Sequence, residues 1–312
     1  MHALKVGLTF RLPGPLVEHL RERFPAVGFA GPGLDTTSFD TSHADILLGW
    51  PKADFVRTAT ALKWIQLFAA GTDIVDFDDV NKRGIIVTNA RGVGSPSIAE
   101  HVLAMMLHFN RRLGVLVRAQ IGGTWIEKNS FDYPELGGQV LTVVGAGSIG
   151  SEIAKRAKAF GMLTYGINRD GRPVVGFDNV VEADAGSDVL QAADHVVACV
   201  SGVEANAHMI DATWLSQMKA GAHFYNVGRG GTVDENALLA ALDDDRVGGA
   251  GLDVTDIEPL PAGHTFWTHP KVLLTQHKAM NSRHYWERLT QLFADNLERF
   301  LKGRPLVNNV HA

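Results

Sequence analysis

Three side chains in the second half of the chain could carry acid–base and anion-binding chemistry: Arg229, Glu258 and His277. Each follows a short apolar run that is typical of a β-strand, and ligands of open α/β sheets bind where the strands end. An arginine can bind a carboxylate through two parallel hydrogen bonds and polarise a neighbouring keto oxygen. A histidine can give that oxygen a proton, and a nearby glutamate can keep the imidazolium charged near neutrality. Together the three form a workable set for the reduction of a 2-oxo acid.

Each of these residues also has a structural interpretation. Arg229 could pair with a surface acid, and Glu258 could be a turn or helix-start acid. His277 could be a structural histidine, since the chain has 13 of them. Asp253, which precedes Glu258, could either support catalysis or bind backbone groups at the end of its strand. The sequence leaves these two roles of Asp253 equally open.

A glycine-rich turn precedes these residues. The stretch "VVGAGSIG" places Gly145, Gly147 and Gly150 in G-x-G-x-x-G spacing, between an apolar run and an amphipathic helix pattern. The first glycine allows a tight turn, the second leaves room for a pyrophosphate, and the third lets helix and strand pack closely. The helix N-terminus then offers N–H groups to the phosphates. We therefore expect a dinucleotide site rather than a purely structural turn.

The residues after the next predicted strand bear on the type of dinucleotide. Asn168 stands where a carboxylate commonly binds the adenosine ribose, and Arg169 follows it. Asn168 removes a charge that would repel a 2′-phosphate, and the planar guanidinium of Arg169 suits phosphate. This pattern favours NADP(H). NAD(H) is possible if Arg169 is only a solvated turn residue and Asp170 bends back to the ribose.

Alternating strand and helix patterns predict an α/β protein with parallel sheets. A long capped helix is expected from Ser97 onward, as a bridge between two domains. The last helix, roughly residues 283–301, comes after the second set of strands. The chain is therefore expected to return to its first domain and make that domain discontinuous.

Composition argues against several classes of protein. The 312 residues are 46% hydrophobic and 20% charged, with a formal net charge of −5, which describes an ordinary globular protein with ample core. No block of like charge supports a nucleic-acid partner, and no apolar run reaches the ~18 residues of a membrane span. The N-terminus is too polar for a signal peptide, and the single cysteine, Cys199, suits a reducing compartment. We therefore expect a cytoplasmic protein. We also expect no metal site, because the histidines do not have the spacing of metal ligands.

The whole chain resembles the D-isomer-specific 2-hydroxyacid dehydrogenases, most of all their glyoxylate/hydroxypyruvate reductase subgroup. The resemblance rests on "VVGAGSIG", "MKAGAHFYNVGRGGTVDENALLAAL", "GAGLDVTDIEPLP" and "LLTQH", in the order and spacing of that family. It implies two Rossmann-like domains with parallel sheets, and a homodimer. The cofactor domain, residues 98–282, is then inserted into a discontinuous substrate domain, residues 1–97 plus 283–312. The implied activity is NADPH-dependent reduction of glyoxylate, hydroxypyruvate or a similar short 2-oxo acid to the D-2-hydroxy acid.

The resemblance also implies a role for each site residue. Arg229 binds substrate, Glu258 orients the histidine, and His277 is the acid/base. The expected cofactor contacts are Gly145, Gly147, Ser148, Ile149, Gly150, Asn168, Arg169, Val200, Ser201, Val227, Gly228, Arg229 and Asp253. The expected substrate contacts are Trp50, Gly71, Thr72, Arg229 and His277.

The first domain contributes less specific signals. Gly71 and Thr72 lie in "AAGTD", where backbone N–H groups could face a carboxylate or simply form a turn. Trp50 could wall a small apolar substrate or only pack. The sequence does not decide whether three further residues line the pocket or are only structural: Arg91, Tyr285 and Trp286.

Two departures from the family's pattern leave alternatives open. Gln276 replaces the proline of the usual Thr-Pro-His, and Ser201 stands near the proline of a loop that usually carries Leu-Pro-Leu-Thr. A formate dehydrogenase also has a Gln before its His, but it lacks the Glu partner, so Glu258 argues against that activity. A non-enzymatic NAD(P)-sensing module is the other alternative, and the three retained catalytic residue types argue against it.

Overall fold

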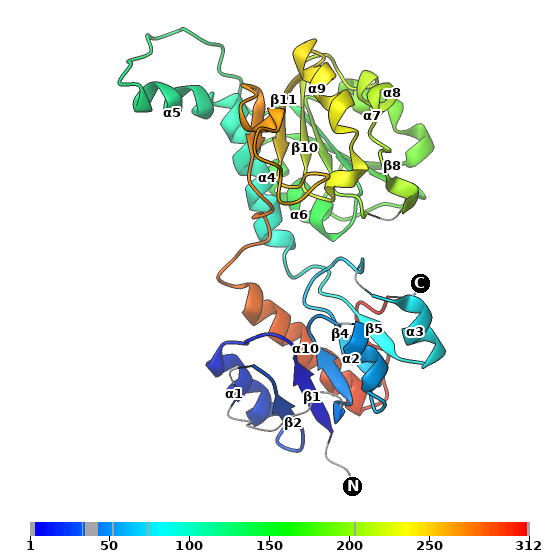
Figure 1. Cartoon of the computed structure of the whole chain (residues 1–312). Coiled ribbons are helices and arrows are strands. Elements are labelled where there is room, and N and C mark those ends of the chain that lie inside the picture. The colour runs from blue at the N-terminus through cyan, green and yellow to red at the C-terminus, as the bar shows by residue number, and fades with distance from the viewer. Residues whose placement is uncertain are drawn as a thin grey trace. The chain divides into compact units, whose positions relative to one another are not determined.

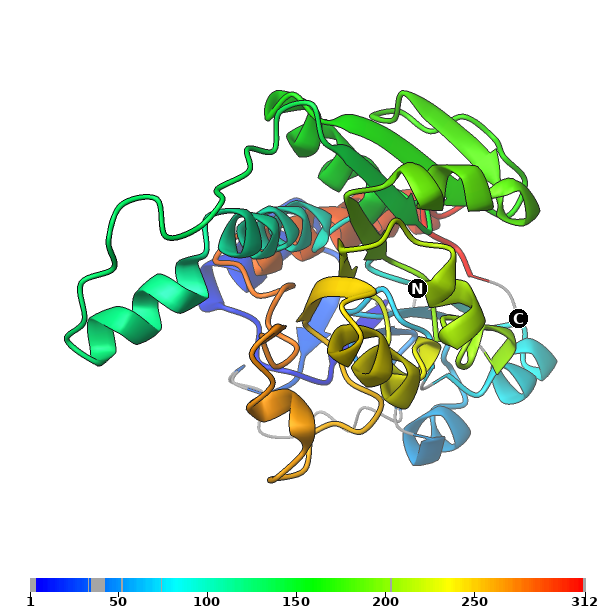
Figure 2. The same cartoon turned by 90° about the horizontal axis from the view of Figure 1, so that it is seen from above.

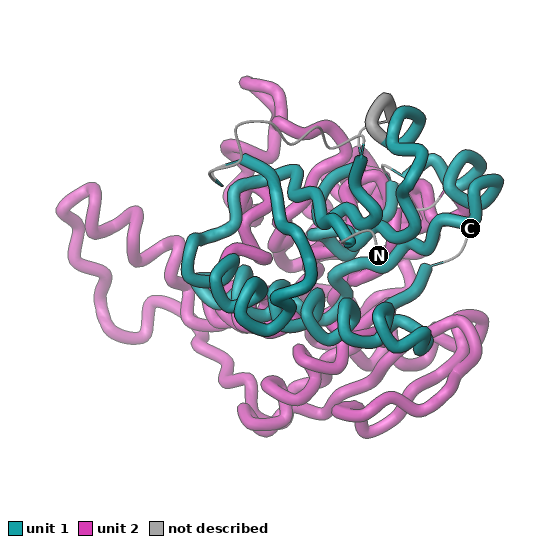
Figure 3. The backbone as a smooth tube through the Cα atoms, turned by 90° about the horizontal axis from the view of Figure 1, so that it is seen from below, with its two compact units in different colours: residues 1–94, 282–312 teal, residues 95–281 magenta. Residues whose placement is uncertain are grey.

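The computed structural model describes residues 4–32, 34, 43–51, 53–73, 75–202 and 204–310. The chain divides into two compact units (Figures 1 and 3). Unit 1 consists of residues 1–94 and 282–312, and unit 2 of residues 95–281. Each unit is built on a sheet of parallel strands flanked by helices. The predicted fold class is confirmed.

Five parallel strands form the sheet of unit 1, in the order β2-β1-β3-β4-β5. Their bounds are Lys5–Leu8 (β1), Gly28–Ala30 (β2), Ile46–Leu48 (β3), Trp64–Gln66 (β4) and Ile86–Thr88 (β5). The helices of this unit are Gly14–Arg23 (α1), Ala53–Thr58 (α2), Phe77–Lys82 (α3) and Tyr285–Leu301 (α10). Alternate side chains of a strand point to opposite faces, so Ile46 and Leu48 pack in one apolar cluster with α1 and α10. Leu47 packs in the other cluster, with α2 and α3.

The C-terminal helix α10 is part of the core of unit 1. Phe293 of α10 stacks on Trp64 of β4, with ring centroids 5.2 Å apart. Asn296 donates a hydrogen bond from Nδ2 to Oε1 of Gln66 at 3.2 Å, and both side chains are fully buried. Buried polar pairs of this kind tie the helix to one position on the sheet.

Seven parallel strands form the sheet of unit 2, in the order β12-β11-β10-β9-β6-β7-β8. Their bounds are Val140–Val144 (β6), Leu163–Asn168 (β7), Asn179–Glu182 (β8), His195–Ala198 (β9), Ala222–Asn226 (β10), Val247–Leu252 (β11) and Val272–Leu274 (β12). The α-helices are Ser95–Asn110 (α4), Leu113–Ile121 (α5), Ser148–Ala159 (α6), Ser187–Ala192 (α7), Ala212–Ser216 (α8) and Glu235–Asp243 (α9). Short 3₁₀ helices span Ala183–Ala185 (η2), Glu204–Asn206 (η3), Gly230–Thr232 (η4) and Thr265–Trp267 (η5).

Helices cover both faces of the unit 2 sheet. Helices α4 and α6 pack on one face, where Leu141 and Val143 of β6 are buried. Helices α7, α8 and α9 pack on the other face, against Val144 and Val196. The strand order reverses at β6, with β7 on one side and β9 on the other. Such a reversal creates a crevice at the carboxyl ends of the strands, where doubly wound sheets bind dinucleotides.

The prediction of one long helix from Ser97 is wrong, because the segment forms two helices. Helix α4 begins at Ser95, so Ser97 lies inside it and donates from Oγ to the carbonyl of Met280 at 3.0 Å. Pro96 explains the earlier start, since proline suits the first turn of a helix. Arg112 has φ 54°, a left-handed conformation that ends α4 and redirects the chain into α5.

None of the helices in the described ranges is both long enough and apolar enough to cross a membrane.

A polar network, buried except at the half-buried Gln139, crosses the interior of unit 2 at the start of β9. His195 lies 3.0 Å through Nδ1 from the hydroxyl of Tyr225 and 2.9 Å through Nε2 from Oε1 of Gln139. Asn110 of α4 also donates to Oε1 of Gln139, at 2.8 Å. A neutral imidazole satisfies this arrangement, because Nε2–H donates to Gln139 and Nδ1 accepts from Tyr225.

Acid is expected to destabilise unit 2 through this network. Burial, with His223 nearby, lowers the pKa of His195 from 6.5 to about 3. Because the folded-state pKa lies below that of the unfolded chain, this stability is present above pH ~6.5 and is lost as the pH falls toward ~3. The contribution of His195 to the free energy of unfolding should fall by about 3 kcal/mol between pH ~7 and pH ~4.

Denaturant unfolding of the wild type and of His195→Gln over this pH range measures the contribution. The variant should be less stable at neutral pH, and its deficit should shrink as the pH falls, because only the wild type must protonate the imidazole at position 195, while His223 is present in both proteins. Parallel stability curves for the two proteins would show that His195 does not resist protonation in the folded state.

Candidate active site

The glycine turn has the geometry that a pyrophosphate needs. Gly145 has φ +96°, and a Cβ there would lie 2.8 Å from the carbonyl oxygen of Cys199. A Cβ on Gly150 would lie 3.0 Å from Val143 and from the carbonyl oxygen of Gly145, so only glycine lets α6 pack this closely on β6. A Cβ on Gly147 would meet nothing within 4 Å. The space beside Gly147 lies at the N-terminus of α6, which has no side-chain cap, and the first N–H groups of the helix can bind phosphate there.

The end of β7 forms a tight turn that exposes arginine. Asn168 donates from Nδ2 to the carbonyl oxygen of Arg172 at 3.0 Å, which closes the turn. Its Oδ1 is buried and accepts no hydrogen bond from the described residues. Arg169 and Asp170 are both exposed on this turn. Asn168 therefore has two distinct side-chain atoms: Nδ2 closes the turn, and Oδ1 has no donor among the described residues. The role of Nδ2 in shaping the turn was not evident from the sequence.

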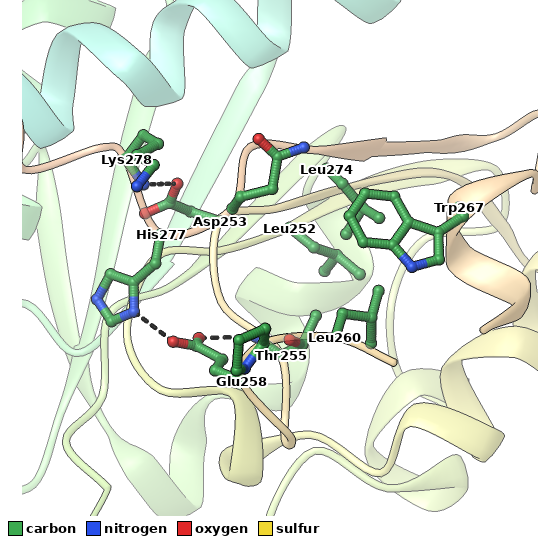
Figure 4. A pocket seen from close by; sticks show the side chains of 11 residues that line it. Leu252, Asp253, Thr255, Glu258, Leu260, Trp267, Leu274, His277 and Lys278 are labelled. Carbon is green, nitrogen blue, oxygen red and sulfur yellow. Dashed lines mark hydrogen bonds and ion pairs between the residues drawn. The ribbon is translucent and has the colours of Figure 1, made fainter. Parts of the chain in front are cut away.

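His277 and Glu258 form a close pair (Figure 4). Nδ1 of His277 lies 2.7 Å from Oε2 of Glu258, and both side chains are partly exposed. Oε1 of Glu258 accepts a hydrogen bond from the backbone N–H of Thr255 at 3.2 Å. The contact with the carboxylate places the proton of a neutral ring on Nδ1, so Nε2 is the atom that can exchange a proton with a substrate.

The turn that carries His277 has an unusual backbone. Gln276 and His277 have φ values of 48° and 57°, which side-chain-bearing residues adopt only when their surroundings impose them. A proline, whose ring fixes φ near −65°, could not occupy position 276 in this conformation. Gln276, which replaces the proline of Thr-Pro-His, therefore stands at a position whose backbone conformation excludes proline.

Asp253 holds this turn in place. The carboxylate is 4% exposed. It accepts hydrogen bonds from the hydroxyl of Thr275 at 2.7 Å and from the backbone N–H of Ala279 at 3.1 Å. It also accepts one from the backbone N–H of Lys278 at 2.8 Å (Figure 4). The backbone N–H of His277 donates to the carbonyl oxygen of Asp253. Asp253 therefore binds backbone at its strand end, one of its two predicted roles, and its contact with a cofactor stays a prediction.

Arg229 follows β10 and lies at the same edge of the sheet. In the parallel register Asn226 pairs with Leu252, and Leu252 pairs with Leu274, so the loops after β10, β11 and β12 leave the sheet together. Arg229 donates from Nη1 to the carbonyl oxygen of Gly228 at 2.9 Å. The loops that carry Arg229, Glu258 and His277 therefore leave the sheet at neighbouring strand ends.

Asn226 fixes the backbone around Arg229, a role that the sequence analysis missed. Its Nδ2 donates to the carbonyl oxygen of Arg229 at 3.0 Å, and its Oδ1 accepts from the N–H of Gly228 at 3.0 Å. The side chain is 1% exposed. An asparagine at the end of an apolar strand, two residues before a glycine, is the signal that could have identified it.

The other expected cofactor contacts lie around the same crevice. A Cβ on Gly228 would lie 2.5 Å from the carbonyl oxygen of Val200, so the ends of β9 and β10 approach closely. Val227 is buried and Ser201 is exposed. Ser148 and Ile149 open helix α6.

The expected substrate residues of the first domain all lie in unit 1. Trp50 is 38% exposed, and its ring lies 4.7 Å from that of Phe68. Gly71 and Thr72 are partly exposed in the loop after β4. Two of the residues left open belong to the core of this unit, since Tyr285 is buried and Trp286 stacks on Phe10 at 5.0 Å.

A pocket of about 480 Å³ adjoins the His277–Glu258 pair (Figure 4). The two catalytic candidates stand at one side of it. Its other side is apolar, formed by Leu252, Leu260, Trp267 and Leu274. Within the ranges that the structure describes, no three His, Cys, Asp or Glu side chains gather as metal ligands.

Comparison with known proteins identifies the family. The family described as D-isomer specific 2-hydroxyacid dehydrogenase, NAD binding domain, matches residues 103–279, more than half of the chain. The chain belongs to the D-isomer-specific 2-hydroxyacid dehydrogenases. As a member of this family the protein is an NAD(P)-dependent oxidoreductase, and the segment that matches the family's NAD binding domain includes the glycine turn.

Relatives within the family cover most of the chain. The glycerate dehydrogenase of Methylorubrum extorquens is 33% identical over 261 residues, or 81% of each protein. The glyoxylate reductase of Thermofilum pendens is 33% identical over 257 residues, or 80% of this chain and 75% of the relative. The solved structure of a D-isomer specific 2-hydroxyacid dehydrogenase family protein from Aeromonas salmonicida subsp. salmonicida A449 is similar with a TM-score of 0.86, at 30% identity and 99% coverage of both chains.

Proposed function

We propose that this dehydrogenase reduces a short 2-oxo acid to the D-2-hydroxy acid with NADPH. The observation that carries the proposal is the 2.7 Å contact between His277 and Glu258, beside the strand end that carries Arg229. Relatives named glyoxylate reductase and glycerate dehydrogenase support a small substrate. Glyoxylate, or hydroxypyruvate as the oxidised partner of glycerate, is the proposed substrate.

The proposed chemistry assigns one task to each residue. The bound nicotinamide supplies the hydride that reduces the keto carbon. The guanidinium of Arg229 binds the substrate carboxylate and polarises the keto oxygen. His277 donates its Nε2 proton to that oxygen, and Glu258 holds Nδ1 so that Nε2 faces the substrate. Trp50, Gly71 and Thr72 are proposed to complete the substrate site from the first domain, residues 1–97 plus 283–312.

The two alternative functions are less well supported. Oxidation of formate transfers no proton to or from the substrate through a side chain, so it gives no reason for a His277–Glu258 pair. A sensing module needs only the dinucleotide site and gives no reason to keep Arg229 as well. The pair and the arginine together favour an enzyme that moves both a hydride and a proton.

A panel of 2-oxo acids assayed with NADPH tests the proposed activity. Glyoxylate and hydroxypyruvate should give the highest kcat/KM, and the product should be the D-isomer where the product is chiral. Turnover of formate in place of every 2-oxo acid would contradict the proposal.

We also propose that the protein prefers NADP(H) to NAD(H). The exposed Arg169 can bind a 2′-phosphate, and Asn168 places no charge against it. Arg169→Ala should lower kcat/KM for NADPH about 10- to 100-fold, the loss expected of one charge-assisted contact. It should leave kcat/KM for NADH nearly unchanged, which makes NADH the internal control. Equal losses with both cofactors, or a wild-type preference for NADH, would count against a phosphate site at Arg169.

A homodimer is proposed from the surface of helix α5. Figures 1 and 2 show α5 and the loop after it standing away from the rest of unit 2. No residue of α5 is buried, and Ile121 and Trp125 are 82% and 87% exposed. Contiguous exposed apolar side chains indicate a surface that another chain covers. Sedimentation velocity tests this proposal, which fails if only monomers are present at micromolar concentration.

A further inference from the structure

We propose that Glu235, in the first turn of α9, is a positioning residue that holds the loop carrying Glu258. This inference rests on the proposed function, because it concerns the same acid–base pair. Oε1 of Glu235 accepts a hydrogen bond from the backbone N–H of Asp256 at 2.9 Å. Its Oε2 lies 3.6 Å from Nε2 of His264. The carboxylate thus contacts the loop on both sides of Glu258.

In its contact with Glu235, His264 turns its protonated ring nitrogen toward the carboxylate. Nδ1 of His264 accepts from the backbone N–H of Phe266 at 3.2 Å, so a neutral ring carries its proton on Nε2, the atom that faces Glu235. The side chains of Glu235 and His264 are only 19% and 26% exposed. Partial burial strengthens a charge-assisted contact compared with the same contact in open water.

The same loop packs directly on the backbone beside Arg229. A Cβ on Gly230 would lie 1.9 Å from the carbonyl carbon of Thr255 and 2.4 Å from the amide nitrogen of Asp256. The Gly230–Thr232 turn and the Thr255–Asp256 segment are therefore in backbone-to-backbone contact. Since α9 follows this turn in the chain, Glu235 ties the turn after Arg229 to the loop that carries Glu258.

A short path leads from Glu235 to the histidine. The backbone N–H of Asp256 binds Glu235, and the neighbouring N–H of Thr255 binds Oε1 of Glu258. The other oxygen of Glu258 binds Nδ1 of His277. If Asp256 is released, Thr255 can shift and the carboxylate of Glu258 loses its fixed donor. Errors of about 1 Å in a catalytic group lower the rate by as much as ~100-fold.

Glu235 is not needed as the cap of α9. Asp234 already accepts from the N–H groups of Asn236 at 3.0 Å and Ala237 at 3.1 Å. An acid in the first turn also stabilises a helix through its dipole, by about 0.3–1 kcal/mol. If Glu235 only stabilised the helix, Glu235→Ala would lower the melting temperature and leave kcat and KM unchanged.

Kinetics of Glu235→Ala test the proposal. We expect kcat with glyoxylate and NADPH to fall about 10- to 100-fold, while both KM values stay within about twofold. Glu235→Gln keeps an oxygen acceptor for Asp256 and should recover part of the loss. Asn236→Ala, at the exposed neighbouring position of the same helix turn, is the matched control and should keep wild-type kinetics. Equal kcat for Glu235→Ala and the wild type would overturn the proposal.

A double-mutant cycle shows whether Glu235 acts through Glu258. In a Glu258→Gln background, Glu235→Ala should cause almost no further loss of kcat, because the group that it positions is already disabled. Losses that multiply independently would overturn the assignment, since they would mean that Glu235 acts by another route.

The ring tautomer of His277 provides a readout that does not depend on turnover. In ¹⁵N-histidine-labelled protein at alkaline pH, the neutral ring should carry its proton on Nδ1 in the wild type and in Asn236→Ala. The signal is assigned with His277→Gln. Glu235→Ala should shift the ring toward the Nε2–H form, and Glu235→Gln, which retains the contact with Asp256, should shift it less. An unchanged tautomer in Glu235→Ala would overturn the positioning role even if no 2-oxo acid is reduced, whereas absence of 2-oxo acid turnover by the wild type would overturn only the proposed function.

Discussion

Replacing His277 by alanine is expected to lower kcat for 2-oxo acid reduction by about 10²- to 10⁴-fold, the usual contribution of a positioned general acid. The reason is that Nε2 of His277 is the proposed proton source for the keto oxygen, with Nδ1 held by Glu258 at 2.7 Å. Binding of NADPH should change little, because the proposed dinucleotide site lies at the glycine turn between β6 and α6. Steady-state kinetics give kcat, and quenching of intrinsic fluorescence gives the Kd for NADPH.

A matched substitution separates this effect from general damage. His19 is exposed on α1, and His19→Ala should keep the wild-type kcat. If His277→Ala keeps more than about a tenth of the wild-type kcat, the residue is not the acid of this reaction.

Arg229→Lys is expected to lower kcat/KM for the 2-oxo acid by about 100- to 1,000-fold, or ~3–4 kcal/mol, although the charge is kept. Lysine cannot form two parallel hydrogen bonds to a carboxylate, and its ammonium cannot also reach the keto oxygen in the same plane. The turn should survive, because Asn226 binds the backbone carbonyl of residue 229 and not its side chain. The measurement is kcat/KM for glyoxylate at saturating NADPH.

The exposed Arg21 of α1 serves as the control, and Arg21→Lys should have no effect on kcat/KM. A loss smaller than about fivefold for Arg229→Lys would mean that the guanidinium does not bind the substrate as a fork. The kinetic assignment of Arg229 would then have to be abandoned, even though the fold around it would be unaffected.

Much of the fold could be predicted because local pattern and tertiary structure agree. The alternation of apolar runs and amphipathic stretches predicted parallel sheets, and glycine spacing predicted the turn at Gly145. Strand β2, Gly28–Ala30, gave no usable signal, since three residues with a glycine are too short for a pattern. The break between α4 and α5 depends on the left-handed backbone of Arg112, and helix propensity alone does not predict such a change.

The candidate site was only partly predictable for a related reason. Residue types indicated the His277 and Glu258 pair, since acid–base chemistry needs those types after strand ends. The supporting contacts join residues that are far apart in the chain and have no local signature. Backbone binding was one predicted role of Asp253, but the sequence did not identify Lys278 as its partner, and nothing in it indicated that Glu235 binds the backbone of Asp256. Such bonds exist only once parallel strands have brought their loops to one edge.

A crystal structure of the enzyme with NADP⁺ and oxamate, a stable analogue of a 2-oxo acid, tests most directly whether Arg229 and His277 act together on the substrate. We expect the carboxylate of oxamate to lie against the guanidinium of Arg229, and its amide carbonyl oxygen to lie within hydrogen-bonding distance of Nε2 of His277. Oxamate bound away from either side chain, with the His277–Glu258 contact intact, would show that Arg229 and His277 do not act together on a 2-oxo acid.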